Sequence, residues 1–299
     1  MRIANWGFLG MALVGFCGMP LSVAAEVGMF GYSDASVVPE VGDPLHDYHE
    51  FLLPVIAPED LPIFRDASAS VEQSPESLAN GYVAGGLGQL KARSLALYPL
   101  DNTLGFAVSE SLVVVQETAT ATSTTANPGD PIAVDLSLAV TGTVSNPASY
   151  EDDLYDASAT AVLVAGDLSN VSLPQLLLAF AVDGTLPPSS DYTVLSFNSH
   201  TSPGSVVTGS FSTTVGATFD LFYALLTNVQ VTGTSPARTA SADYSNSLSF
   251  SLIPAEPGTT ITTFGGQEFA NPVPEPQTWL LLGAGLLVLT AWSARRRTT

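Results

Sequence analysis

Two histidines lie close enough in the sequence to suggest metal binding. His46 and His49 are three residues apart within the run His-Asp-Tyr-His-Glu, and on a helix both imidazoles would lie on one side. No second pair of ligands follows, and the run lies in a proline-rich segment. The sequence therefore favours exposed polar residues here, and we predict no metal site.

Carboxylates form the second group with chemical potential. Glu151, Asp152 and Asp153 are consecutive, and Asp156 follows shortly after. Several such oxygens could hold Ca²⁺, but the alternating ligand spacing and the glycine of an EF-hand loop are absent. We predict no cofactor, with weak calcium association as the alternative.

The sequence gives little support for catalysis. His200 would have to act as the base of a serine hydrolase, yet no Gly-x-Ser-x-Gly motif occurs. Phosphate-binding loops, dinucleotide-binding fingerprints and Cys-x-x-Cys pairs are also absent. A two-carboxylate glycan hydrolase needs no fixed spacing, and 28 acidic residues form many accidental pairs. We predict a protein that is not an enzyme and has no catalytic residues, with a secreted glycan hydrolase as an alternative.

The charge balance excludes one class of partner. The 299-residue chain has 8 basic and 28 acidic residues, and four of the basic ones lie in terminal segments that we expect to be removed. The remaining body carries a net charge of about −24, which repels phosphate backbones. Nucleic acid is therefore not a partner. Cys17 is the only cysteine and lies in the leader, so no disulfide is expected.

The first 25 residues have the pattern of a secretory signal peptide. A weakly basic start is followed by an apolar run over residues 3–23, and small residues precede Glu26. We predict export through the Sec machinery with cleavage between Ala25 and Glu26. A retained N-terminal anchor helix is the alternative.

The C-terminal segment, residues 270–299, has three consecutive parts. Val273, Pro274, Glu275 and Pro276 come first, and residues 278–294 are almost free of polar groups. At 1.5 Å per residue these 17 or so apolar residues span about 25 Å, which is barely enough to cross a membrane. The final part is the cluster Arg295, Arg296 and Arg297, which predicts a cytoplasmic C-terminus and an external body.

This order of motif, short transmembrane helix and arginine cluster resembles the PEP-CTERM sorting tail. The resemblance covers about the last 27 residues, and it implies cleavage by an exosortase in a Gram-negative bacterium that makes extracellular polysaccharide. The catalytic cysteine would belong to the exosortase. A permanent anchor helix is the alternative, but it gives no reason for the Pro-Glu-Pro motif.

The sequence between these two terminal segments changes in composition near residue 80. Residues 26–80 are acidic and rich in proline, and we predict a mostly irregular lead-in. Residues 81–269 contain short runs of apolar and β-branched residues between turn residues, which predicts strands. The predicted strands are 89–97, 112–116, 132–140, 159–164, 176–182, 192–197, 206–213, 218–227, 247–252 and 259–264, with a short helix over 174–181 as an alternative.

These strands predict a mainly β fold, an antiparallel β-sandwich with a jelly-roll or immunoglobulin-like outline. Segments such as 88–92 and 242–248 resemble the bodies of small PEP-CTERM proteins, which implies a shared sandwich and no chemistry. The threonine-rich stretch 118–125 is predicted to be a flexible loop, with an O-glycosylated loop as the alternative.

Together these features predict an exported protein that passes through the inner membrane and reaches the cell surface or the extracellular polysaccharide matrix. A structural or exopolysaccharide-associated role fits best. The alternative is a carbohydrate-binding module or adhesin, in which Tyr150, Tyr155 or Tyr192 would line an exposed groove.

Overall fold

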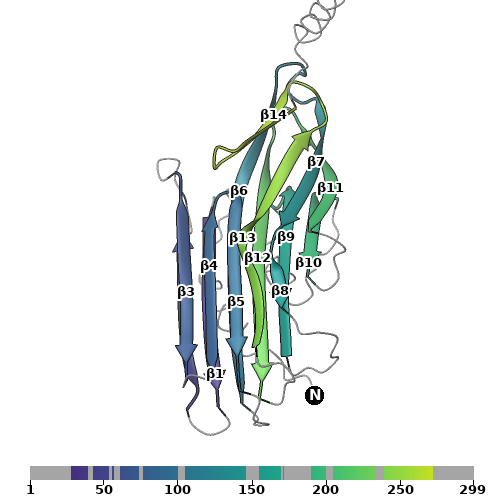
Figure 1. Cartoon of the computed structure of the whole chain (residues 1–299). Helices are drawn as coiled ribbons and strands as arrows, with labels where there is room; N and C mark the ends of the chain where they lie inside the picture. The colour runs from purple at the N-terminus through teal and green to yellow at the C-terminus, as the bar shows by residue number, and fades with distance from the viewer. Residues whose placement is uncertain are drawn as a thin grey trace, which may run out of the picture.

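The chain folds into two antiparallel β-sheets that pack face to face (Figure 1). The computed structural model describes residues 28–39, 43–53, 56, 61–73, 77–99, 105–145, 155–169, 171, 190–199, 205–233 and 239–271. The first sheet, called sheet A, has the order β10 (Tyr192–Asn198), β9 (Tyr155–Gly166), β12 (Thr218–Thr232), β6 (Phe106–Ser123), β1 (Gly28–Val38), β2 (Leu45–Leu53). The hairpin of β14 (Thr259–Thr263) and β15 (Glu268–Asn271) joins this sheet because β14 pairs with the end of β6.

The second sheet, called sheet B, covers one face of sheet A. Its order is β11 (Val206–Thr214), β7 (Pro131–Val140), β13 (Thr239–Pro254), β5 (Gln89–Leu97), β4 (Leu78–Gly86), β3 (Phe64–Glu72), and β8 (Thr143–Ser145) pairs with β13. The predicted mainly β sandwich is confirmed. Within the residues described, no helix has the length and hydrophobicity needed to cross a membrane. The predicted signal helix and the transmembrane helix 278–294 lie outside those residues.

Most of the predicted strands are present, and several are longer than the sequence pattern suggests. Strand β5 has the predicted bounds 89–97, and β7, β10, β11 and β14 differ from the prediction by one residue at one end. Strands β6, β9, β12 and β13 extend well beyond their predicted cores. The predicted strand 176–182, and the short helix considered over 174–181, lie outside the described residues.

The space between the sheets is filled differently along its length. One part contains large aliphatic and aromatic side chains, including Leu136, Leu163 and Leu225, which are almost fully buried. The other part contains mainly alanine and valine, such as Ala35, Ala96 and Val229. Because small side chains occupy little volume, the two sheets must approach more closely there.

Serines and a glycine mark the closest approach. The Ser109 hydroxyl of sheet A donates a 2.8 Å hydrogen bond to the backbone carbonyl of Asn80 in sheet B. A Cβ atom placed on Gly81 would lie 2.2 Å from Ser33 Oγ and 2.8 Å from Ser111 Oγ. A side chain at position 81 would therefore have to displace these serine hydroxyls.

The outer face of sheet A carries a second apolar cluster. Phe222 and Ala224 of β12 and Val164 of β9 are buried on this face, and Leu168, which follows β9, packs with them. The central strands are consequently buried on both faces, so their sequences are continuous apolar runs rather than alternating ones. The run Leu-Val-Val-Val over residues 112–115 of β6 is one example.

The prediction of a mostly irregular segment over residues 26–80 is wrong. Strands β1, β2 and β3 lie in this segment. Strands β1 and β2 belong to sheet A, and β3 belongs to sheet B. The prolines fall between the strands: Pro39 follows β1, Pro44 precedes β2 and Pro54 follows it. Their density reflects the connections between three successive strands, where a proline removes no donor from a strand ladder.

The prediction of a flexible loop over residues 118–125 is also wrong for most of the stretch. Strand β6 continues to Ser123, and more buried and less buried side chains alternate along this stretch, as expected for a strand. Ala119 and Ala121 are buried, whereas Thr118 and Thr120 lie on the opposite face. Strand β14 pairs with this part of β6, so the threonines belong to the sheet.

Candidate functional site

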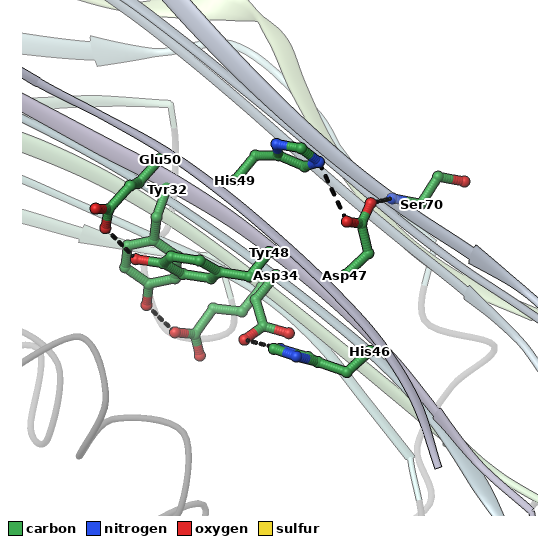
Figure 2. Close-up of polar contacts among 9 residues, drawn as sticks. Tyr32, Asp34, His46, Asp47, Tyr48, His49, Glu50 and Ser70 are labelled. Carbon is green, nitrogen blue, oxygen red and sulfur yellow. Dashed lines mark hydrogen bonds and ion pairs between the residues drawn. The ribbon is translucent and has the colours of Figure 1, made fainter. Parts of the chain in front are cut away.

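The two histidines considered as metal ligands lie on strand β2, an edge strand of sheet A. Successive residues of a strand point to opposite faces, so His46 and His49 point away from one another. His46 Nε2 lies 3.2 Å from Asp34 Oδ2, and His49 Nε2 lies 3.1 Å from Asp47 Oδ1 (Figure 2). The helical spacing that would bring both imidazoles together is absent, because this segment is a strand.

Asp47 performs a structural task at the lateral edge of the sandwich. Its Oδ2 atom accepts a 2.8 Å hydrogen bond from the backbone N–H of Ser70 in β3, the edge strand of sheet B (Figure 2). An unpaired N–H on an edge strand is a template for unwanted strand pairing. The carboxylate therefore blocks this position of the edge and links the two sheets.

Polar side chains gather on the outer face of sheet A, beside the apolar cluster. We call them the outer-face polar patch. The β1–β6 register places Asp34 directly opposite Glu110, and Tyr48 of β2 is directly opposite Asp34 on the other side. The patch consists of Tyr32, Asp34, His46, Tyr48, Glu50, Glu110 and Asn228.

Hydrogen bonds connect most members of this patch. The Tyr32 hydroxyl donates to Glu110, and Asn228 Nδ2 donates to Glu110 Oε2 over 2.9 Å. The Tyr48 hydroxyl donates to Glu50 over 2.7 Å, and the Tyr48 ring lies between those of Tyr32 and His46 (Figure 2). These carboxylates already have partners within the sheet, which is typical of a structural network.

Burial shapes the electrostatics of the patch. Desolvation raises the pKa of Glu110, although the hydrogen bonds from Tyr32 and Asn228 oppose this. Desolvation also raises the pKa of Asp34, against the effect of His46. Among the residues that the structure describes, no group of three or more His, Cys, Asp or Glu side chains is placed to hold a metal ion.

The patch contains one pair of neighbouring carboxyl groups. Asp34 and Glu110 lie side by side on the same face of one sheet, and each accepts a hydrogen bond or ion pair from another side chain of the patch.

A second acidic site lies inside the sandwich and was missed by the sequence analysis. Glu117 of β6 is fully buried between the sheets. Its Oε1 atom accepts a 2.8 Å hydrogen bond from the Tyr223 hydroxyl, and its Oε2 atom accepts one of 3.1 Å from the backbone N–H of Gly265. The Thr263 hydroxyl also bonds to it. The sequence signal was a glutamate at an inward-facing position of an alternating strand.

Tyr223 extends this network to sheet B. Its hydroxyl oxygen accepts a 2.5 Å hydrogen bond from the backbone N–H of Gly88, in the turn between β4 and β5. Glu117 therefore joins three segments that are distant in sequence: sheet A, the β4–β5 turn, and the tip of the β14–β15 hairpin. Such a fully bonded polar group in a core specifies one arrangement of its neighbours.

Burial raises the pKa of Glu117 because desolvation outweighs its hydrogen bonds. A carboxyl group with a raised pKa in the folded state favours folding when it is protonated. That contribution is complete below the unfolded value, near 4.5, and is lost as the pH rises through the folded value. Glu110 has the same sign.

Because both pKa values are raised above 4.5, we expect the protein to become more stable as the pH falls from neutral toward that value, opposite to ordinary acid denaturation. Differential scanning fluorimetry across this range would measure the trend. Glu117→Gln should flatten the slope, whereas Glu268→Gln, which changes an exposed residue of β15, should leave it unchanged. A melting temperature that falls steadily below pH 7 would contradict this assignment.

The remaining candidates from the sequence are dispersed. Tyr192 is 8% exposed and packs in the outer apolar cluster, so it does not line an exposed sugar-binding groove. Asp156 lies on β9 with an exposed side chain. Tyr150, His200 and the run 151–153 lie outside the described residues, and the side chain of Tyr155 is also not described.

Both processing segments also lie outside the described residues, but the strands reach close to them. Strand β1 begins at Gly28, shortly after the predicted cleavage site between Ala25 and Glu26. Strand β15 ends at Asn271, immediately before the segment that contains Pro274, Glu275 and Pro276. The folded body therefore extends almost to both predicted cleavage sites.

Comparison with known proteins supports the C-terminal assignment. The family model of the PEP-CTERM protein-sorting motif matches residues 272–297. This range includes the predicted motif, the apolar segment and the three arginines at 295–297. No curated protein and no solved structure matches the chain. The chain thus carries a PEP-CTERM sorting motif, which marks an exported protein that is sorted by an exosortase.

Proposed function

We propose that the protein is a non-enzymatic β-sandwich that an exosortase releases from the inner membrane to the cell surface or the extracellular polysaccharide matrix. The observation that carries this proposal is the sorting motif over residues 272–297. In this account residues 278–294 hold the chain in the membrane, Arg295, Arg296 and Arg297 stay in the cytoplasm, and cleavage occurs near Glu275.

A structural or exopolysaccharide-associated role agrees with the site chemistry. The carboxylates of the outer-face polar patch and Glu117 are bonded within the fold, so their chemistry is that of a scaffold. The acidic surface favours solubility outside the cell. Exopolysaccharide, the exosortase and the Sec machinery are the partners in this proposal, and no cofactor is needed.

The proposal is tested by producing the full-length chain in a host with an active exosortase and in the same host lacking that enzyme. We expect release from the inner membrane only in the first host, because the tail alone is a weak but complete membrane anchor. Fractionation followed by immunoblotting provides the measurement. Identical membrane-bound, full-length protein in both hosts would reject exosortase sorting.

The leader makes a separate prediction. Because β1 begins at Gly28, cleavage after Ala25 leaves the first strand intact. We expect N-terminal sequencing of the exported protein to begin at Glu26. A protein that still starts at Met1 would show that the N-terminal segment is retained as an anchor.

A further inference from the structure

The last element of the fold is a hairpin that directly precedes the sorting motif. Strand β14 pairs with β6 from Ser123 to Ala119, and β15 pairs with β14 (Figure 1). At the hairpin tip, the backbone N–H of Phe264 donates a 2.8 Å hydrogen bond to the carbonyl of Thr118. The hairpin is thus an addition to the end of the long central strand of sheet A.

Glu117 fastens the tip of this hairpin to the body. The N–H of Gly265 donates to the carboxylate of Glu117, which Tyr223 also holds. The tip packs tightly against the β4–β5 turn, since a Cβ atom on Gly265 would lie 2.7 Å from Leu87 Cβ. The buried carboxylate is therefore one of the contacts that dock the tip, beside the β14–β6 pairing and the backbone bond from Phe264 to Thr118.

The chain between the hairpin and the membrane is short. Glu275 is four residues beyond the end of β15, so fully extended chain places it within about 14 Å of Asn271. The apolar segment begins at Thr278, within about 25 Å of Asn271. A docked hairpin therefore leaves no more than these lengths of chain between the folded body and the predicted cleavage site and membrane segment.

We propose that docking of the β14–β15 hairpin limits cleavage of the sorting motif, and that Glu117 is the positioning residue that sets this limit. The inference rests on the proposed exosortase processing. Release of the hairpin would add roughly 17 residues, or about 55 Å of extended chain, between β13 and the motif. The exosortase would then reach Glu275 without contact with the sandwich.

Pulse-chase labelling of the full-length chain in the exosortase host tests this inference. Glu117→Ala removes the acceptor that holds the hairpin tip, and an insertion of six Gly and Ser residues after Asn271 lengthens the gap in an intact fold. Each should shorten the half-time of processing at least threefold. Glu268→Gln, an exposed change on β15, should not alter it. Unchanged or slower processing of the insertion variant would overturn the inference while leaving exosortase sorting intact.

Hydrogen exchange on the full-length protein in detergent provides the second readout. In Glu117→Ala, the hairpin amides over residues 259–270 should exchange at least tenfold faster, while the amides of β12 and β13 keep their protection. Equal protection of the hairpin in variant and parent would overturn the role of Glu117. Loss of protection throughout the sandwich would also overturn it, because Glu117 would then hold the whole fold and not the hairpin alone.

Discussion

Glu275→Ala is expected to leave the full-length protein in the inner membrane, whereas the parent is recovered shortened by roughly its last 20 to 25 residues. The substitution changes neither the apolar length of residues 278–294 nor the arginine cluster, so insertion and orientation should be unaffected. Only recognition by the exosortase should be lost. The effect should be nearly all-or-none on an immunoblot of membrane and external fractions.

Two further variants show whether this effect is specific. Glu268→Ala removes an exposed carboxylate from β15, a few residues away, and should be processed like the parent. Neutral replacement of Arg295, Arg296 and Arg297 should impair an earlier step, the positioning of the chain in the membrane, because the short helix then lacks its cytoplasmic anchor. If Glu275→Ala and the parent both stay full length in a host with a working exosortase, the chain is a single-span envelope protein.

Gly81→Ala is expected to destabilise the sandwich by about 3 kcal/mol, because the added Cβ would lie 2.2 Å from Ser33 Oγ in the opposite sheet. The three nearest atoms are serine hydroxyls, which must rotate and lose their hydrogen bonds across or along the sheets to make room. For a domain of this size the melting temperature should fall by roughly 10 °C. Thermal unfolding followed by circular dichroism would measure this change.

A second substitution identifies the cause. Ser33→Gly removes the nearest hydroxyl, so the double variant with Gly81→Ala should recover part of the lost stability. Ala133→Val, which enlarges an exposed side chain on β7, should have little effect. A Gly81→Ala protein as stable as its parent would show that the sheets are farther apart than the structure indicates.

The sequence predicted strands where apolar residues alternate with polar ones or form β-branched runs, as in β5 and β7. It missed β1 because several inward-facing side chains there are small or absent: Gly31 lies against the Phe51 ring, and Ser33 and Ala35 follow without a hydrophobic signal. It missed β2 and β3 because the prolines between them resemble an irregular segment. Side-chain size in a core depends on the distance between the sheets, which local periodicity does not contain.

The same contrast between local and distant signals holds for the functional residues. The sorting tail was predictable because its three parts are contiguous and each has a local physical reason. Glu117 was not, because its partners Tyr223 and Gly265 are more than 100 residues away in sequence. The separation of His46 and His49 follows from strand geometry, because residues three apart on a strand point to opposite faces.

Intact-mass measurement of the protein recovered from a host with its export and sorting systems shows whether both ends are processed. We expect a polypeptide that begins at Glu26 and lacks roughly the last 20 to 25 residues, with any further mass assigned to modification of the new C-terminus. A mass that includes Arg295, Arg296 and Arg297 would contradict exosortase processing.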